Sequence, residues 1–347
     1  MKIAIVFGGS SYEHEISIVS AITVKNVLKS HTPLFIFIDA NRDFYLVDSE
    51  NMKSKFFSSK EYLKKSKKLN IEHGGFSTSG MFGSKKVEYD VVLNLIHGRD
   101  GEDGKLASMF EFFDIKFIGP RLESAVLSFN KLYTKFLADS LNVKTLDYQL
   151  INRGDAKECT LDFPVIVKPL RLGSSIGVSV VKSQEEFDYA LDVAFEFDTQ
   201  VLIEPFIDGI KEYNQAGIKG KDWTLSIIEE PQKEEFLDFD KKYMDFSRDE
   251  RVSEANIDES LKSKIVDTFK KIYDPIFMGS IIRCDFFVVD NEVYLNEINP
   301  IPGSMANYLF DDFDKVLSEV ATNLPKEKNI NIEYLYINSI QKAKGKA

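Results

Sequence analysis

The first apolar residues of the chain form a short continuous run that ends in glycines. Residues 3–7 are all apolar, residues 8–9 are both glycine, and apolar side chains then return at helical spacing over residues 18–28. Another apolar run follows at residues 34–38. Since a strand that is buried on both faces is apolar throughout, this pattern predicts a strand, a glycine turn, a helix and a second, parallel strand.

The same domain is predicted to continue after a polar interruption. Residues 41–88 are rich in lysine and serine, and we expect an irregular excursion or a hairpin with a short helix there. An apolar run at residues 91–96 leads into a glycine-rich loop, residues 97–104, and then a helix. Gly119 and Pro120 close the segment. The pattern predicts a doubly wound α/β domain with a parallel sheet over residues 1–120.

Shorter apolar runs alternate with glycine turns in the rest of the chain. Helices are predicted at residues 128–141, with Ser128 as a cap, and at residues 185–194 and 261–272. Strands are predicted at residues 163–167, 178–181, 201–203, 213–218 and 225–228. This mixture is typical of α+β domains, which we place at residues 121–207 and 208–347.

Composition excludes several classes of protein. A chain of 347 residues is long enough for two or three domains, and its net charge of -11 argues against a nucleic-acid surface. No apolar stretch reaches the length of a membrane span, and the run at residues 3–7 is too short for a signal peptide. Cys159 and Cys284 lack metal-ligand spacing and fit a reduced compartment. We expect a soluble cytoplasmic protein that binds neither nucleic acid nor membrane.

Oxygen ligands gather on two predicted strands near the C-terminus. Arg283 and Asp285 share one face of the first strand because strand side chains alternate, and Glu297 and Asn299 share a face of the next. Carboxylate and amide oxygens are the ligands that Mg²⁺ takes beside phosphates, and Arg283 adds a fixed positive charge. These residues predict a metal site for a nucleotide; the alternative is an exposed polar hairpin.

The turn between these strands decides whether the two carboxylates meet. A three-residue loop at residues 289–291, with Asn291 in the left-handed region, would put Arg283 opposite Glu297 and Asp285 diagonal to it on the same face. A two-residue turn at residues 290–291 would separate the carboxylates. A metal site at this hairpin therefore requires the three-residue loop.

Two segments in the middle of the chain suit a nucleotide. Lys168 ends a predicted strand and precedes a loop of small residues, 173–177, whose backbone N–H groups could approach phosphates. A P-loop is excluded because that motif places its lysine after the loop, and an ordinary flexible hairpin is the alternative. Further on, Glu204 or Glu212 could hold an adenine amino group or ribose beside the turn at Pro205. By itself, Glu204 fits a surface carboxylate better.

Carboxylates also stand at the edge of the first predicted sheet where doubly wound folds bind ligands. Glu13 and Glu15 follow the first glycine turn, and two carboxylates there favour an ammonium group over a dinucleotide. Their alternative role is to complement the helix dipole. His97 leaves a strand at the same edge and is a candidate site residue, although a lone histidine is more often structural.

Five segments, in this order, resemble the ATP-grasp ligases and specifically the D-alanine–D-alanine ligase family. They are residues 7–17, 97–104, 168–177, 242–243, and the pair 283–285 and 296–303. The resemblance covers nearly the whole chain. It implies a doubly wound N-terminal domain followed by a two-part ATP-grasp fold, with ATP under the small-residue flap and the amino acids facing the N-terminal domain.

The resemblance also implies a nucleotide site with two magnesium ions, for which manganese is a possible substitute. Asp285, Glu297 and Asn299 match the metal ligands of the family, with Glu297 bridging both ions. The residues implied to contact ATP are Lys131, Lys168, Ser174, Ser175, Glu204, Phe206, Ile207, Glu212, Lys242, Asn296 and Glu297.

For the amino acids, the resemblance implies two subsites. Glu15 resembles the residue that meets the ammonium group of the first substrate, in a hydrogen-bonded cluster with Ser174 and Tyr243. His97 would lie near the carboxylate of that substrate. Tyr243 is the residue expected when the second substrate is D-alanine.

The remaining residues implied by the resemblance concern the transfer steps. Lys242 would belong to a mobile loop over the γ-phosphate, and Arg283 with the Gly303 N–H would stabilise an oxyanion. The family usually has a serine that helps to hold the second substrate's carboxylate. This chain has Tyr308 at that position, followed by Leu309, so the second subsite departs from the family pattern.

The resemblance therefore implies ATP-dependent ligation of two D-alanines through an acyl phosphate, in peptidoglycan precursor synthesis. The alternatives are an ATP-grasp ligase with other amino acid substrates and a non-catalytic nucleotide-binding regulator. The expected partners are ATP and D-alanine, and a homodimer is expected only by family analogy.

Overall fold

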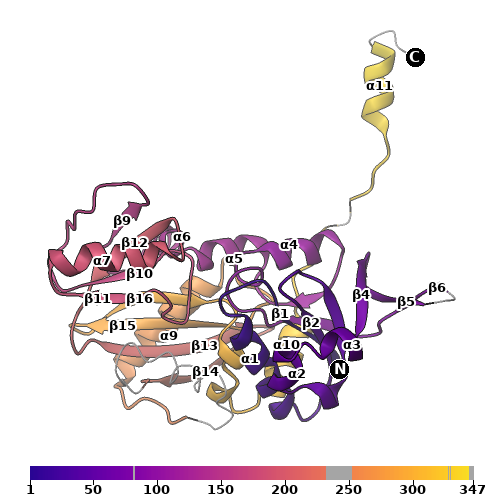
Figure 1. Ribbon diagram of the computed structural model, residues 1–347, viewed down its shortest axis with the longest axis horizontal. Helices are drawn as coiled ribbons and strands as arrows, with labels where there is room; N and C mark the ends of the chain where they lie inside the picture. The colour runs from indigo at the N-terminus through magenta and orange to yellow at the C-terminus, as the bar shows by residue number, and fades with distance from the viewer. Residues whose placement is uncertain (81–82, 232–251, 327, 329, 344–347) are drawn as a thin grey trace.

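The computed structural model describes residues 1–80, 83–231, 252–326, 328 and 330–343, and in these ranges the strands form three sheets. Figure 1 shows the N-terminal sheet at one end of the body and the second sheet at the opposite end, with the third sheet beside both. Each sheet lies within one of the three predicted segments, whose boundaries at residues 120 and 207 stay a prediction.

The N-terminal sheet has eight strands in the order β6-β5-β4-β3-β2-β1-β7-β8. Its parallel part comprises β1 (Lys2–Gly8), β2 (Thr32–Ile38), β7 (Val91–Asn94) and β8 (Phe117–Ile118). The helices of this segment are α1 (His14–Val27), α2 (Ser54–Ser58), α3 (Tyr62–Lys65) and α4 (Lys105–Phe112), with a 3-10 turn η1 (Ser49–Asn51). The predicted β1–turn–α1–β2 unit is confirmed.

Of the two alternatives expected for residues 41–88, the irregular excursion is wrong and the hairpin with a short helix is confirmed in part. The segment contains two short helices, and its strands pair antiparallel with their neighbours and extend the main sheet. These strands are β3 (Phe44–Val47), β4 (Lys67–Glu72), β5 (Gly75–Gly80) and β6 (Gly83–Lys86). The sequence does not predict these strands individually because the outer ones are largely exposed and therefore need few apolar side chains.

The other two sheets are antiparallel and have four strands each. The second sheet contains β9 (Gln149–Asn152), β10 (Val165–Pro169), β11 (Ser179–Val181) and β12 (Gln200–Pro205), covered by α7 (Gln184–Phe195). The third contains β13 (Lys211–Lys219), β14 (Trp223–Glu229), β15 (Ile282–Val289) and β16 (Glu292–Asn299), covered by α9 (Glu259–Tyr273). The strands and both helices predicted here are confirmed within a few residues at their ends.

The helix predicted over residues 128–141 is confirmed as α6 (Lys131–Ser140), but its start is wrong. The first two predicted residues belong to the preceding helix, α5 (Leu122–Phe129). The break occurs at Asn130, whose side chain accepts hydrogen bonds from the backbone N–H groups of Leu132 and Tyr133. Asn130 is therefore the cap of α6, and the predicted cap, Ser128, lies buried inside the first helix.

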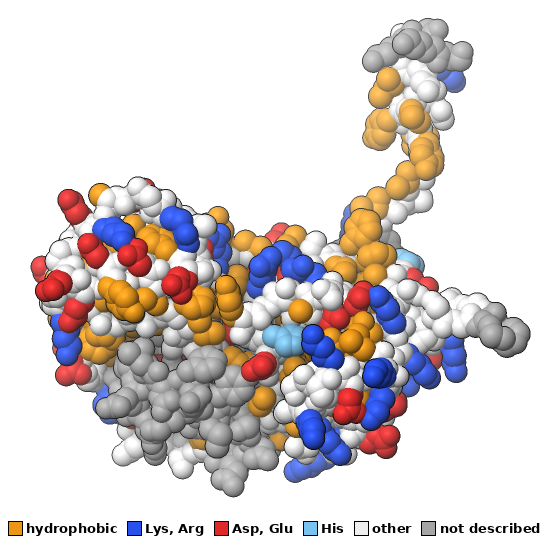
Figure 2. Space-filling view, viewed as in Figure 1, with side chains coloured by type: hydrophobic (Ala, Val, Ile, Leu, Met, Phe, Trp, Pro, Cys, Tyr) orange, Lys and Arg blue, Asp and Glu red, His pale blue; other side chains and the backbone are white. Residues whose placement is uncertain are grey.

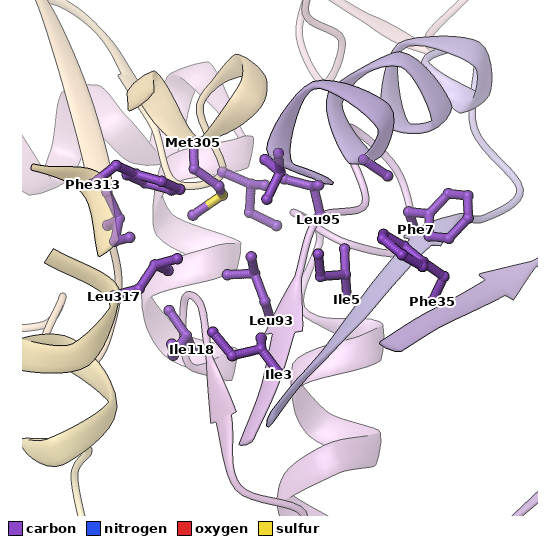
Figure 3. Packing of buried hydrophobic residues seen from close by; sticks show 14 of the residues in the cluster. Ile3, Ile5, Phe7, Phe35, Leu93, Leu95, Ile118, Met305, Phe313 and Leu317 are labelled. Atoms are coloured by element: carbon purple, nitrogen blue, oxygen red, sulfur yellow. The ribbon is translucent and has the colours of Figure 1, made fainter. Parts of the chain in front are cut away.

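One hydrophobic core joins the N-terminal sheet to the C-terminal part of the chain. Ile3, Ile5 and Leu93 pack with Met305 and Phe313 (Figure 3). Met305 lies in η2 (Gly303–Leu309), a turn in which residues 304–306 are left-handed, and α10 (Phe313–Thr322) follows it. Because this core is shared, the loops at the edge of the first sheet are held against the strands of the third.

The last helix, α11 (Leu335–Ala343), stands apart from the body in Figure 1. Figure 2 shows hydrophobic side chains along this helix and the segment before it, and Ile330, Tyr336 and Ile340 among them are exposed. None of the helices in the described part of the chain could span a bilayer.

Candidate active site

A cavity of about 320 Å³ is lined by residues of all three predicted segments. It opens between the second and third sheets, and the loops after β1 and β7 contribute to its wall. Most of the residues selected from the sequence line this cavity: His97, Lys131, Lys168, Ser174, Ser175, Glu204, Phe206, Ile207, Glu212, Arg283, Asp285, Asn296, Glu297, Asn299, Gly303 and Tyr308.

Two of the described residues selected from the sequence, Glu15 and Leu309, do not line this cavity. Glu15 is exposed on α1, and Glu13 lines the cavity in its place. Leu309 is fully buried in the core shared with the N-terminal sheet, so its side chain supports the site from behind. Lys242 and Tyr243 lie outside the described residues.

The two carboxylates of the hairpin meet, but by a different route from the predicted loop. The turn has two residues, Asp290 and Asn291, and both are left-handed. A β-bulge between Asp285 and Phe286 then shifts the register, so that Asp285 pairs directly with Glu297. The bulge restores the common face that a two-residue turn alone would have removed.

Arg283 and Asp285 form a bidentate ion pair in the cavity wall. The Arg283 Nε donates to Asp285 Oδ1 at 2.7 Å and its Nη2 donates to Oδ2 at 2.8 Å. Asn299 Nδ2 also donates to Oδ2, at 2.9 Å. Arg283 Nη1 points the other way and donates to the Tyr308 hydroxyl at 3.4 Å. The Arg283 guanidinium therefore connects Asp285, a candidate metal ligand, to Tyr308 at the expected second subsite.

The donor set of the hairpin fits a hard cation. Asp285, Glu297 and Asn299 line the cavity and offer carboxylate and amide oxygens, the ligands that Mg²⁺ prefers. No group of three His, Cys, Asp or Glu side chains with a metal-binding arrangement occurs in the part of the chain that the structure describes. An ion at the hairpin would therefore depend on the Asn299 oxygen and on oxygens from a ligand such as a phosphate.

A buried cluster of charges forms another part of the wall. Lys168 Nζ donates to Glu204 Oε2 at 2.7 Å, and Lys135 Nζ donates to Glu204 Oε1. Burial raises the pKa of Glu204, but the two ammonium groups outweigh burial and hold it at about 2. Nearby, Lys131 Nζ donates to the Leu172 carbonyl at 2.6 Å, just before the small-residue loop. Lysine cations thus line the cavity next to residues 173–177.

Glu13 lies on the opposite side, beneath the same loop. The Ser174 hydroxyl donates to Glu13 Oε1 at 2.6 Å, and Oε2 is buried without a hydrogen-bond partner. Glycines make the space: a Cβ on Gly98 would lie 2.3 Å from Oε2, and one on Gly173 would lie 2.9 Å from Oε1. Burial, followed by the negative charge of Glu102, raises the pKa of Glu13 to about 7.

His97 is buried between α1 and the loop that begins with it. Its Nε2 lies 2.8 Å from the Ser20 hydroxyl, and its Nδ1 lies 3.8 Å from Glu102 Oε1. Burial lowers the pKa of His97 to about 4, so the imidazole is neutral near pH 7. Burial and the charge of Glu297 raise the pKa of Glu102 to about 8. The raised pKa values of Glu13 and Glu102 therefore favour partly protonated carboxyls at this edge of the cavity near pH 7.

The sequence offers Glu13 beside Glu15, and the resemblance favours Glu15; Glu102 and Lys135 are not selected from the sequence. The position of Glu13 directly before α1, which begins at His14, is the signal that it belongs to the loop. Glu102 lies in the glycine-rich loop already selected for His97. Lys135 carries no signal in the sequence, because a lysine on a helix is ordinarily exposed.

Comparisons with known proteins agree with this arrangement. Residues 2–120 match the family described as D-ala D-ala ligase N-terminus, and residues 137–315 match D-ala D-ala ligase C-terminus. The chain belongs to the D-alanine–D-alanine ligase family. It is 67% identical over 347 residues to the D-alanine–D-alanine ligase of Sulfurovum sp. (strain NBC37-1), with both chains fully covered. The D-alanine–D-alanine ligase of Wolinella succinogenes is 58% identical, again over the full length of both.

A solved structure of this family has the same fold. The D-alanine–D-alanine ligase from Helicobacter pylori is 50% identical and superposes with a TM-score of 0.84, covering 94% of this chain and all of that one. The ATP-grasp fold of the D-alanine–D-alanine ligases is thus the fold of this protein. The parallel strands β1, β2 and β7 of its N-terminal domain and the α+β character of the rest are the parts predicted from the sequence.

Proposed function

We propose that the protein is an ATP-dependent ligase that joins two D-alanines into D-alanyl-D-alanine for peptidoglycan precursor synthesis. Membership of the family supports the reaction. The observation that carries it in this chain is a single cavity that holds a lysine-lined wall, an oxygen-ligand hairpin and the buried Glu13 carboxylate. These features suit a polyphosphate, a divalent cation and an ammonium group in one place.

ATP is assigned to the part of the cavity that the lysines line. Lys131 and Lys168 lie where they can neutralise phosphates, beneath the loop of residues 173–177. The adenosine is assigned to the edge after β12, with Phe206, Ile207 and Glu212. Asp285, Glu297 and Asn299 would hold Mg²⁺, or Mn²⁺ in its place. A divalent ion bound there would offset charge on the transferring phosphoryl group.

The first D-alanine is assigned to Glu13, with Ser174 as its neighbour. Its ammonium group would donate a hydrogen bond to Glu13 Oε2, which is buried without a hydrogen-bond partner from the protein. The carboxylate of this D-alanine attacks the γ-phosphorus of ATP, the bond to the β-phosphate oxygen breaks, and an acyl phosphate and ADP are formed. Lys168 and Arg283 offset negative charge during this step.

The second D-alanine is assigned to the space beside Arg283 and Tyr308. Its amine attacks the carbonyl carbon of the acyl phosphate after losing a proton, and phosphate leaves as the amide forms. Arg283 and the Gly303 N–H line the cavity and are assigned to the oxyanion of the tetrahedral intermediate. Tyr308 takes the position of the usual serine and is assigned to the substrate's carboxylate. Lys242 and Tyr243 keep the roles implied by the resemblance as a proposal.

The test is to measure ADP release with ATP, Mg²⁺ and one amino acid at a time. D-alanine alone should give ADP and D-alanyl-D-alanine, with little turnover for L-alanine, D-serine or D-lactate. Turnover with another amino acid in preference to D-alanine would favour a different ATP-grasp ligase. ADP release that does not depend on any amino acid would contradict the ligase assignment.

Three further expectations belong to this proposal. The enzyme would work in the cytoplasm, where ATP is available and where the two cysteines, both free in the structure, would stay reduced. It would form a homodimer, as family analogy suggests. The segments 1–120, 121–207 and 208–347 would be its domains.

A further inference from the structure

Lys135 does not line the cavity, but it shares its carboxylate partner, Glu204, with Lys168, which does. Lys135 is 5% exposed and reaches Glu204 from the side of α6. Its ammonium also donates to the Leu146 carbonyl at 3.1 Å and lies 5.6 Å from the centre of the Tyr148 ring. Lys135 is therefore held behind the wall, while Lys168 faces the cavity.

Glu204 divides its two oxygens between these lysines. Oε1 accepts from Lys135 and Oε2 accepts from Lys168 at 2.7 Å. Two ammonium groups and one carboxylate leave this buried cluster with an excess of one positive charge. If Glu204 were paired with Lys168 alone, the buried ion pair would be neutral. Glu204 and an anion in the cavity would then compete for the same ammonium group.

We infer that Lys135 is a positioning residue that holds Glu204 from behind, so that the charge of Lys168 is available to the phosphates of the nucleotide. The inference rests on the proposed ATP-dependent function. When a polyphosphate enters the cavity, the Lys168 ammonium turns toward the phosphates, and Glu204 remains paired with Lys135. Without Lys135, every gain at the phosphates would leave a buried carboxylate unpaired, which is a costly arrangement.

The experiment compares adenosine with ADP, each titrated calorimetrically at fixed Mg²⁺, because only ADP has phosphates. In the unaltered protein ADP should bind far more tightly than adenosine. Lys135→Met should lower the affinity for ADP by at least about tenfold, which equals about 1.4 kcal/mol. The affinity for adenosine should change by less than about threefold. A merely structural role would weaken both ligands alike. Lys135→Arg, which keeps the charge, should keep most of the preference for ADP.

The double variant Lys135→Met with Glu204→Gln tests whether an unpaired Glu204 carboxylate causes the loss of ADP affinity. It removes the unpaired carboxylate, so it should regain the preference for ADP over adenosine even if both ligands bind more weakly. It also serves if Lys135→Met alone does not fold. The matched control is Lys144→Met, an exposed lysine that pairs with Glu292, which should leave the affinity for both ligands unchanged.

Each outcome decides the question. An unchanged ADP preference in Lys135→Met would overturn the role of Lys135, and so would a double variant whose preference stays as low as that of the single one. If the unaltered protein binds ADP no better than adenosine, the proposed ATP-dependent function fails instead. The two failures are therefore distinguishable.

Discussion

Asp285 lies directly opposite Glu297 across the β15–β16 hairpin because a β-bulge corrects the register set by a two-residue turn. Asn296 is the residue left without a partner in that ladder. In an antiparallel pair, side chains of directly opposed residues share a face and stand within contact distance. The hairpin can therefore present both carboxylates to one cation.

Glu297→Gln should abolish most turnover. The amide keeps the shape of the side chain but removes the charge that a divalent ion needs. Since even the loss of a partner of a metal ligand costs 10–100-fold, we expect a fall in kcat of at least about a hundredfold. Steady-state ADP release measures it, and Mn²⁺ binding in the presence of ADP, followed by electron paramagnetic resonance, should weaken in parallel.

The control for this change is Glu292→Gln on the same strand. Glu292 is exposed and pairs with Lys144 and Lys264 at the outer end of the hairpin. Its loss should leave turnover near normal, because exposed ion pairs contribute little. Near-normal turnover by Glu297→Gln would rule out the metal site.

Glu13 and Glu15 give a second matched pair. Glu13→Gln removes the carboxylate proposed to bind the first ammonium group, so the KM for D-alanine at the first subsite should rise by at least about tenfold, the size of a lost charged hydrogen bond. Glu15→Gln, on the exposed side of α1, should change it little. Initial rates over a wide range of D-alanine concentration separate the two subsites. The reverse result would restore Glu15 as the recognition residue.

The ligand-free protein should lose stability as the pH rises from about 6.5 to 8. The pKa values of Glu13 and Glu102 are raised to about 7 and about 8 from 4.5, so in this range the folded state binds more protons than the unfolded state. By linkage, the free energy of unfolding then falls with increasing pH. His97, with its lowered pKa, acts in the opposite sense below about pH 6.5.

Glu102→Gln isolates this effect. The variant should show a smaller loss of melting temperature between pH 6.5 and 8 than the unaltered protein, because one titrating carboxyl is gone and the pKa of Glu13 falls. Melting curves without substrates measure it. Parallel pH dependence in the two proteins would show that these carboxyls ionise normally.

Tyr308→Phe should affect the second D-alanine selectively. The change removes the hydroxyl that accepts from Arg283 and that is proposed to meet the second carboxylate. We expect the KM of the second subsite to rise by about three- to tenfold, with the first subsite unchanged, since a net hydrogen bond contributes about 0.5–1.5 kcal/mol. Tyr189→Phe, on an exposed face of α7, is the control. Equal changes at both subsites would contradict this assignment.

Leu309→Ala should destabilise the protein. Leu309 is fully buried in the core between the N-terminal sheet and η2, and truncating such a side chain costs about 2–5 kcal/mol. Denaturant unfolding measures the loss of free energy of unfolding. Tyr308→Phe in the same turn should have a free energy of unfolding close to that of the unaltered protein. A stable Leu309→Ala with an altered KM for D-alanine would place this side chain in the subsite after all.

The local elements and most of the chemistry of the site can be predicted from residue type and spacing alone. The apolar run at residues 3–7 and the glycines after it dictate a buried strand and a turn, because these preferences act over a few neighbouring residues. Lys168 and the oxygen ligands near residue 297 are likewise evident from residue type and spacing.

Which of these residues come into contact depends on the packing of the whole fold. The contact between Ser174 and Glu13 joins positions 161 residues apart, and only the shared core and the glycines around Glu13 select it over Glu15. The bulge opposite Asn296 and the burial of Lys135 behind Glu204 also depend on packing between distant segments. Such contacts follow from the free energy of the whole fold, which no local pattern contains.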